Sequence, residues 1–210
     1  MTQTIKTGTT CIGLIYKDGV LLAADKRVTA HKIESDTFTK VFEVSKSIVS
    51  TVAGAAAAAQ MYIRVLKSEI KLFELSHERN VRVHEAAMIL NSMQYSGVRQ
   101  SGEIVACILG GYDEKKGFSL YDLSFDGTVV SHEGYVTTGS GSVYAKSILD
   151  SEHKSNMSEK DAVVLAEKAF KAAFKNDNAS GGGFIVKLIT KDKIVEIEKT
   201  LKAELIGEAK

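Results

Sequence analysis

The run Gly8 to Asp25, GTTCIGLIYKDGVLLAAD, gives the clearest early sign of the fold. Residues 10 to 16 and residues 20 to 24 are apolar and rich in residues that favour strands, and Lys17-Asp18-Gly19 separates them. An Asp-Gly turn between two such segments is a strong hairpin signal. We therefore predict that the chain begins with an antiparallel β-hairpin.

Strands and helices follow this hairpin in blocks. Ile63, Leu66, Ile70 and Phe73 recur at three- and four-residue spacing, which predicts an amphipathic helix, and Ser158 is placed to cap another. The expected strands cover 40–44, 47–52, 103–110, 118–123, 128–131, 135–137, 184–189 and 194–197, and the expected helices cover 55–79, 83–94, 142–151 and a segment opened by 158–161. We expect the strands between 103 and 137 to form a second sheet and those at 184–189 and 194–197 to form a closing pair. Blocks of this kind favour an α+β sandwich of two sheets with helix pairs outside over a parallel doubly wound sheet.

The composition limits the classes of partner and site. The 210 residues are 44% hydrophobic, with a formal net charge of +1, which predicts one globular domain without an electrostatic preference for nucleic acid or an anionic membrane. Cys11 and Cys107, the two cysteines, are too few for a disulfide framework and lack metal-ligand spacing. No apolar stretch suits a signal peptide or a membrane span. We expect a soluble, cytoplasmic protein without metal or cofactor.

Thr9 is the residue that could carry chemistry. A threonine hydroxyl is a poor nucleophile, but removal of Met1 to Gly8 would give Thr9 a free α-amine as its own base. Such an amine has a pKa of about 7.7 to 8.0, against about 10.4 for lysine. Lys40 would therefore stay cationic and lower the pKa of the amine, while Asp25 would hold Lys40 in place. Taken singly, the three are more often a strand residue, a turn former and a surface charge.

Several ordered motifs extend this pattern along the chain. They are Gly8-Thr9-Thr10, Leu22 to Arg27, Lys40-Val41-Phe42, Val52-Ala53-Gly54, Leu109-Gly110-Gly111, Thr138 to Ser142 and Asp177 to Gly181. From Thr9 to about Ile197 the chain resembles proteasome β subunits of the archaeal type. The resemblance implies the amino-terminal nucleophile hydrolase fold, a four-layer αββα sandwich.

The same resemblance implies a threonine-type endopeptidase of the 20S core that degrades unfolded polypeptides. Thr9 matches the nucleophile, Asp25 and Lys40 its charge partners, and Gly54 the backbone amide of the oxyanion hole. The residues that match those around the nucleophile's amine are Ser140, Asp177 and Ser180. Read without the resemblance, Gly54 could merely permit a sharp turn, and Asp177 with Ser180 could merely end a helix.

The positions that match the family's substrate pocket are apolar in this chain. Val28, Val52 and Ala56 correspond to residues that line the pocket for the residue before the cut, and Thr29 to a backbone contact of an extended substrate. We expect cleavage after hydrophobic residues. Two departures affect the pocket: Ala55 to Ala59 lacks the usual acidic residue, and the loop between Arg27 and Lys40 is about one residue short.

The resemblance also implies processing and partners. Residues 1–8 would be a propeptide removed by autolysis, with the Gly8-Thr9 bond as the cleavage site, and residues 9–210 a single catalytic domain. Expected partners are other β subunits in seven-membered rings, α-subunit rings and a regulatory ATPase acting through the α ring. The main alternative is a catalytically silent or unprocessed structural β subunit. A bacterial two-ring protease subunit fits the Asp177 to Gly181 motif less well, and a plain ligand-binding sandwich would make all the motifs accidental.

Overall fold

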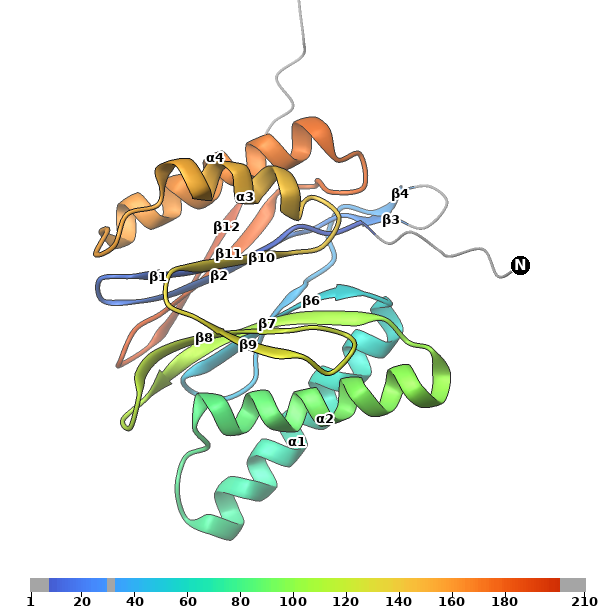
Figure 1. Ribbon diagram of the computed structural model, residues 1–210, viewed down its shortest axis with the longest axis vertical. Helices are drawn as coiled ribbons and strands as arrows, with labels where there is room; N and C mark the ends of the chain where they lie inside the picture. Colours follow the sequence, from blue (N-terminus) through green and yellow to red (C-terminus); the bar gives the residue numbers. More distant parts are fainter. Residues whose placement is uncertain (1–7, 30–32, 201–210) are drawn as a thin grey trace, which may run out of the picture.

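The computed structural model describes residues 8–29 and 33–200, and most of the expected leader, residues 1–7, lies outside that range. Two five-stranded sheets face each other, and a pair of helices covers the outer face of each sheet (Figure 1). Every strand pairing in both sheets is antiparallel. The predicted α+β sandwich with four layers is therefore confirmed.

The first sheet has the order β10-β1-β2-β11-β12. Its strands are β1 (Cys11–Tyr16), β2 (Gly19–Asp25), β10 (Tyr135–Thr138), β11 (Phe184–Ile189) and β12 (Ile194–Lys199). The register from Cys11 opposite Ala24 to Tyr16 opposite Gly19 confirms the opening hairpin. All residues of β2 are buried, since it lies in the middle of the sheet with both faces covered.

The second sheet has the order β5-β6-β7-β8-β9. Its strands are β5 (Val41–Glu43), β6 (Ile48–Gly54), β7 (Val105–Asp113), β8 (Gly117–Leu123) and β9 (Val129–His132). The expectation that the strands from 103 to 137 form this sheet was partly wrong. β5 and β6 belong to it as well, because β6 pairs with β7 across two intervening helices, whereas β10 pairs with β1 in the first sheet.

The helices lie as two pairs. α1 (Ala56–His77) and α2 (Val83–Ser101) cover the second sheet, and α3 (Ser142–Glu152) and α4 (Glu159–Asn176) cover the first (Figure 1). The Ser158 side chain accepts a hydrogen bond from the amide of Asp161, so the predicted cap of α4 is confirmed. Among the described residues, no helix is both long enough and apolar enough to cross a membrane.

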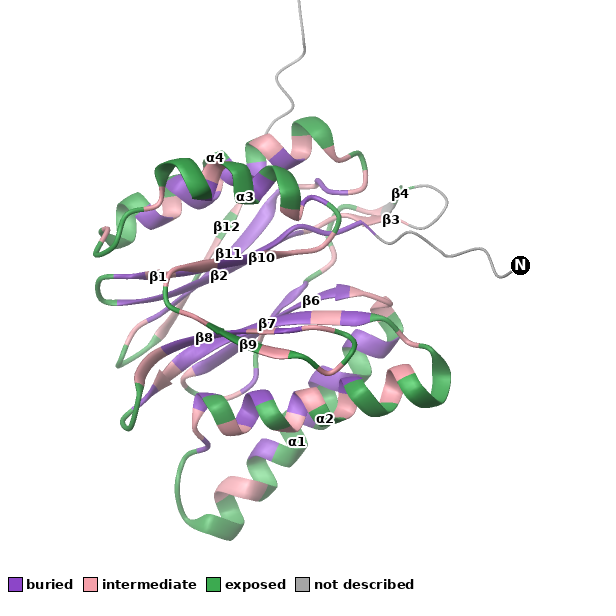
Figure 2. Cartoon of the chain, viewed as in Figure 1, coloured by how far each residue is buried: buried purple, intermediate pink, exposed green. Residues whose placement is uncertain are grey.

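Apolar side chains fill three layers of core. One cluster lies between the two sheets and includes Leu22, Ile108 and Leu120, and one lies beneath each helix pair. The buried residues, purple in Figure 2, accordingly follow the central strands and the sheet-facing sides of the helices. Each fully buried aliphatic side chain contributes about 1.5 to 3 kcal/mol relative to exposure. The sandwich is thus a rigid support for the loops at its ends.

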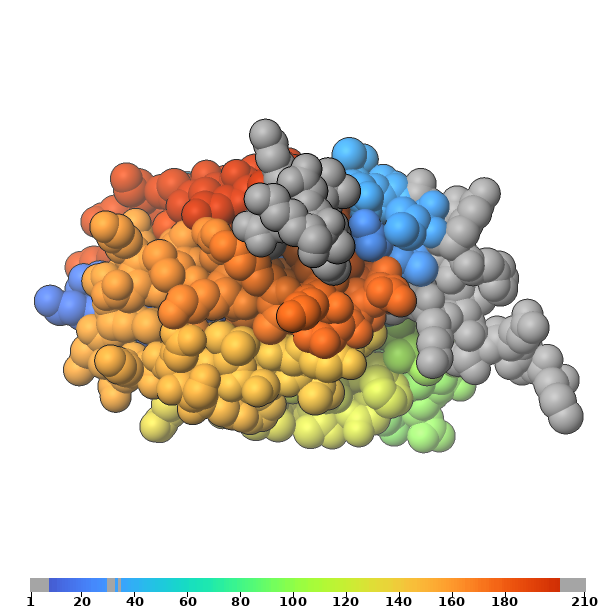
Figure 3. Space-filling model, turned by 90° about the horizontal axis from the view of Figure 1, so that it is seen from above, coloured from blue at the N-terminus to red at the C-terminus, as the bar shows by residue number. Residues whose placement is uncertain are grey.

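A small ribbon projects from one end of the sandwich, within the segment between Arg27 and Lys40 that was expected to be a loop. It consists of β3 (Val28–Thr29) and β4 (Ile33–Ser35), which form a separate two-stranded sheet among the residues that the structure describes (Figure 1). Seen from above, this light-blue segment lies beside the orange loop that follows α4 (Figure 3). The Thr29 hydroxyl donates to the Ala179 carbonyl of that loop at 3.1 Å.

Candidate active site

Thr9, Asp25 and Lys40 meet at this end of the sandwich. The Lys40 ammonium donates to Thr9 Oγ1 at 3.0 Å and to Asp25 Oδ1 at 2.9 Å. All three residues are buried, and the Asp25 side chain is fully so. A hydroxyl, a cation and an anion are therefore held together away from bulk water.

The two sheets bring these residues together. Thr9 precedes β1 and Asp25 ends β2, and the amide and carbonyl of Thr10 bond to the Asp25 side chain and amide at 3.0 and 3.1 Å. Lys40 precedes β5 in the other sheet, where its carbonyl accepts from the Val52 amide at 3.0 Å. The backbone of Lys40 is thus hydrogen-bonded to the second sheet, while its side chain reaches Asp25 in the first.

The Asp25 carboxylate is surrounded by donors. Besides Lys40, it accepts from the backbone amides of Thr10 at 3.0 Å, Gly181 at 3.0 Å and Arg27 at 3.2 Å. Burial raises the pKa of the Asp25 carboxyl, while the Lys40 ammonium and the amides of Thr10 and Gly181 act in the opposite direction. All four groups donate hydrogen bonds to Asp25, and such donors favour the ionised carboxylate over the protonated carboxyl. The carboxylate in turn holds the Lys40 ammonium in position.

A second network lies against the nitrogen of Thr9. That nitrogen donates to Ser140 Oγ at 3.1 Å, and Ser140 Oγ donates to Asp177 Oδ2 at 2.6 Å. Ser180 Oγ donates to the same Asp177 oxygen at 2.7 Å and lies 2.8 Å from Thr10 Oγ1. The predicted residues Ser140, Asp177 and Ser180 therefore meet around the atom that would become the free amine. Asp177 also caps the end of α4, so the structural reading of this residue holds as well.

The Gly8-Thr9 peptide bond lies inside the same cluster. Thr9 Oγ1 donates to the Gly8 carbonyl oxygen at 2.6 Å, and Lys40 Nζ donates to that oxygen at 3.1 Å. A Cβ at Gly8 would lie 1.9 Å from the Ala179 Cβ and 2.3 Å from its carbonyl oxygen, so only glycine fits. The Thr9 hydroxyl, the Gly8 carbonyl and the Lys40 ammonium are thus adjacent while the Gly8-Thr9 bond is intact.

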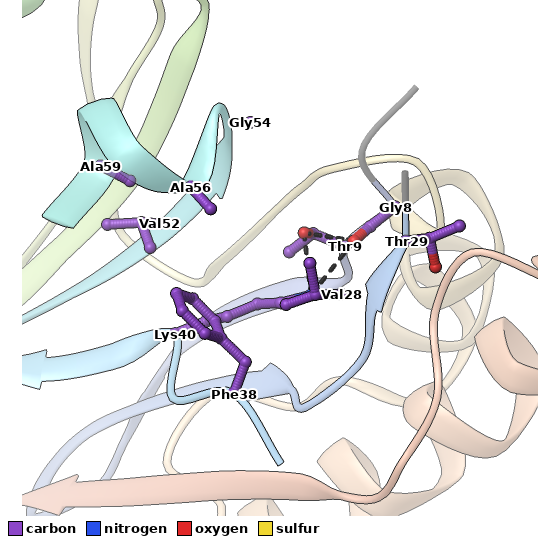
Figure 4. A pocket seen from close by; sticks show the side chains of 10 residues that line it. All are labelled: Gly8, Thr9, Val28, Thr29, Phe38, Lys40, Val52, Gly54, Ala56 and Ala59. Carbon is purple, nitrogen blue, oxygen red and sulfur yellow. Dashed lines mark hydrogen bonds between the residues drawn. The ribbon is translucent and has the colours of Figure 1, made fainter. Parts of the chain in front are cut away.

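A pocket opens beside the Thr9 hydroxyl (Figure 4). The four residues predicted to bind substrate, Val28, Thr29, Val52 and Ala56, all line it together with Thr9, Lys40 and Gly54. Sequence reasoning missed Phe38 and Ala59, which line it as well. Phe38 could have been found as the one aromatic residue in the polar loop before Lys40. The side chains around the mouth are apolar apart from Thr9, Thr29 and Lys40.

Gly54 is the last residue of β6, and α1 begins two residues later at Ala56. Its φ is +121°, and a Cβ there would meet the Ile104 carbonyl oxygen at 2.1 Å, so the position requires glycine. Ala55 is the N-cap of α1 and offers no side-chain acceptor to the first amides of the helix. The first amides of a helix favour an anion, and this helix start faces the pocket.

The cysteines provide no competing nucleophile. Cys11 and Cys107 are completely buried, and burial raises the pKa of the Cys11 thiol to about 12. Within the described ranges, no three His, Cys, Asp or Glu side chains form a group that could hold a metal ion. The polar side chains that line the pocket are those of Thr9, Thr29 and Lys40.

Comparisons with known proteins show which family the chain is similar to. A family model described as "Proteasome subunit" matches residues 5–189. "Proteasome subunit beta" of Methanocorpusculum labreanum is 36% identical over 192 residues, covering 91% of this chain and 90% of the relative. The "Proteasome subunit beta" of Archaeoglobus profundus is 37% identical over 193 residues, covering 91% and 89%, and that of Methanoregula boonei 35% identical over 205 residues, covering 97% and 95%.

Proposed function

Because the chain belongs to the proteasome subunit family, as a β-type subunit of the 20S core, we propose that it is a threonine endopeptidase with Thr9 as its nucleophile. The observation that supports this most directly is the contact of Lys40 Nζ with both Thr9 Oγ1 and the Gly8 carbonyl oxygen. A cation in that position stabilises negative charge on the attacking oxygen and on the carbonyl that it attacks.

The first reaction is removal of residues 1–8. Thr9 Oγ1 attacks the Gly8 carbonyl carbon, the C–N bond breaks, and the Thr9 nitrogen gains the proton that the hydroxyl loses. The Gly8 acyl group is then an ester on Thr9 Oγ1, and water hydrolyses this ester to free the leader carboxylate and the hydroxyl. The products are a leader of residues 1–8 and a catalytic domain of residues 9–210 with a free amine at Thr9.

The free amine then acts as the general base for polypeptide substrates. It accepts the proton of Thr9 Oγ1 as that oxygen attacks the scissile carbonyl, and it returns the proton to the leaving amine. Ser140 and Asp177 hold the protonated amine, since the serine links it to the carboxylate. The Gly54 amide at the strand end is the proposed oxyanion donor, a role worth about 3 to 4 kcal/mol. Water hydrolyses the resulting ester and restores Thr9.

The pocket and the ribbon determine what is cut. Val28, Val52 and Ala56 offer no charge to a substrate side chain, which supports cleavage after hydrophobic residues. Thr29 lies on β3 at the rim, where an extended unfolded polypeptide would pair with the backbone. Docking on α rings, packing in a seven-membered β ring, control by a regulatory ATPase and a cytoplasmic location stay predictions.

Co-expression with an α subunit tests the proposal. Intact mass should show loss of residues 1–8 from the wild-type chain on assembly, together with hydrolysis of fluorogenic peptides. Thr9→Ala should keep the leader and abolish hydrolysis, whereas Thr9→Ser, which retains a hydroxyl, should keep both reactions. An assembled wild-type chain that retains residues 1–8 would instead support the silent structural subunit.

A further inference from the structure

Arg27 lies between the proposed catalytic residues and the substrate ribbon, and the proposed mechanism gives its side chain no role. It follows Asp25 by two positions and precedes Val28 and Thr29, which line the pocket. Its backbone amide already donates to Asp25 Oδ2 at 3.2 Å. Its guanidinium is about one-fifth exposed and points the other way, toward two segments far apart in the sequence.

The first segment is the end of the ribbon. Arg27 Nε donates to Asp36 Oδ1 at 2.8 Å, and Nη2 donates to Oδ2 at 3.4 Å, a forked pairing of guanidinium and carboxylate. Asp36 directly follows β4 and precedes Phe38, whose amide donates to the Lys26 carbonyl at 3.0 Å. The ion pair thus joins the two ends of the ribbon, next to the three pocket residues Val28, Thr29 and Phe38.

The second segment is the loop that supports the Thr9 amine. Arg27 Nη1 donates to the carbonyl oxygens of Asn178 at 3.3 Å and Ser180 at 3.4 Å. A Cβ on Gly181 would lie 2.6 Å from Arg27 Cζ, so the guanidinium packs directly on the loop backbone. The two carbonyls flank Ala179, which accepts from Thr29 Oγ1.

We propose that Arg27 and Asp36 form a positioning clamp that fixes the substrate ribbon relative to the Asp177–Gly181 loop, so that a bound peptide bond and the Thr9 amine stay in register. This inference rests on the proposed threonine endopeptidase. A planar guanidinium can serve the carboxylate and both carbonyls together, whereas a lysine ammonium at the same site has neither the fork nor the reach. The clamp acts through Thr29, Asp177 and Ser180 and touches no reacting atom.

Three variants separate the two attachments. Asp36→Asn weakens the hold on the ribbon and leaves the carbonyl contacts, so KM for an extended peptide should rise several-fold, with kcat within about two-fold of wild type. Arg27→Lys loses both attachments, and kcat should fall as well, by about ten-fold, since small misplacements of reacting groups are costly. Arg79→Lys is the matched control, because Arg79 also joins a carboxylate, that of Glu85, to a backbone carbonyl, that of Asn80.

A readout independent of activity accompanies the kinetics. Hydrogen exchange of the peptide that spans residues 177–183 should speed up in Arg27→Lys and stay at the wild-type rate in Arg79→Lys. Equal kinetics and equal exchange in Arg27→Lys and Arg79→Lys would overturn the clamp, and so would losses of kcat that only follow a lower unfolding midpoint. Failure of the proposed function itself would appear separately, as absence of hydrolysis by the wild-type chain, with the exchange comparison still decisive for the clamp.

Discussion

The Thr9 hydroxyl oxygen lies 2.6 Å from the Gly8 carbonyl oxygen, and the Lys40 ammonium contacts both atoms. One cation is therefore shared by the proposed nucleophile and by the bond that it would break first. The same cation is held by a fully buried carboxylate from the other sheet. Leader removal and peptide hydrolysis should respond together to changes at Lys40 and differently to changes at Gly8.

Gly8→Ala should slow leader removal by about ten-fold or more. The added Cβ would overlap Ala179, so the carbonyl must leave its place beside Lys40, and misplacement of that size is costly. Intact mass measured over time after mixing with an α subunit follows the reaction. A chain produced with Thr9 as its first residue should hydrolyse peptides at the normal rate, because it lacks residue 8. Leader removal from Gly8→Ala at the wild-type rate would contradict the geometry.

Lys40→Met should abolish hydrolysis and lower the free energy of unfolding by about 3 to 5 kcal/mol, since it leaves the buried Asp25 carboxylate without its cation. Urea unfolding of the isolated chain measures the loss. Lys26→Met is the matched control, because its partner Glu198 is half exposed, and it should cost about 1 kcal/mol or less.

The loss in Lys40→Met should shrink at lower pH. Burial already raises the pKa of Asp25, and removal of the cation raises it further. The folded variant then binds a proton more tightly than the unfolded chain, so lowering the pH stabilises the folded form relative to neutral pH. A loss that is independent of pH would show that Asp25 is not the group left unpaired.

Peptides that end in leucine or tyrosine should be cleaved faster than peptides that end in arginine or glutamate. Val28, Val52 and Ala56 carry no charge, and the Lys40 ammonium that also lines the pocket is already paired with Asp25. Phe38→Ala should then favour tyrosine over leucine by about ten-fold relative to wild type, since it removes an aromatic ring from the wall. Ratios of kcat/KM across the peptide set provide the measurement. A wild-type preference for arginine would overturn the pocket assignment.

Glu85 provides a test of stability against pH at a distance from the pocket. Its hydrogen bonds with Arg79 lower the pKa of the Glu85 carboxyl from the ordinary 4.5 to about 2. A depressed pKa contributes stability above the unfolded value, and this contribution is lost as the pH falls from about 4.5 toward 2. Because both side chains are partly exposed, Glu85→Gln should cost only about 0.5 to 1 kcal/mol at pH 7. The urea midpoints of the wild-type chain and Glu85→Gln should draw together below pH 4.5 and converge only as the pH approaches 2.

Local patterns predicted most of the elements. The Asp18-Gly19 turn, the apolar stripe of α1 and the Ser158 cap each depend on residues close together in the sequence. The expected end of α2 at Gln94 was early, since the helix continues to Ser101 through Gly97. Glycine disfavours a helix interior locally, but at Gly97 a side chain would collide with the Tyr62 hydroxyl of α1. Packing between helices decides that position.

The site was predicted less evenly. Asp25 and Thr10 face each other through the hairpin register, which the sequence indicates. The pairing of β6 with β7 spans α1 and α2, and no local pattern contains it. Phe38 and the Arg27–Asp36 pair were missed because their loop folds back on the Lys26 carbonyl and the 178–181 loop, which are tertiary contacts. Val28, Thr29 and Phe38, which lie in the segment expected to be a loop, therefore line the pocket.

Because the Gly8 carbonyl lies beside Lys40, the presence or absence of the leader can report whether a site is active. Under the proposed function, each chain carries a Gly8-Thr9 bond that its own site is placed to cut, so the mass of that chain reports whether the site has completed this first reaction. In a ring that mixes wild-type and Thr9→Ala chains, the ratio of short to long chains counts working sites without any added substrate. Intact-mass measurement would then give the number of active sites in a particle before any peptide assay.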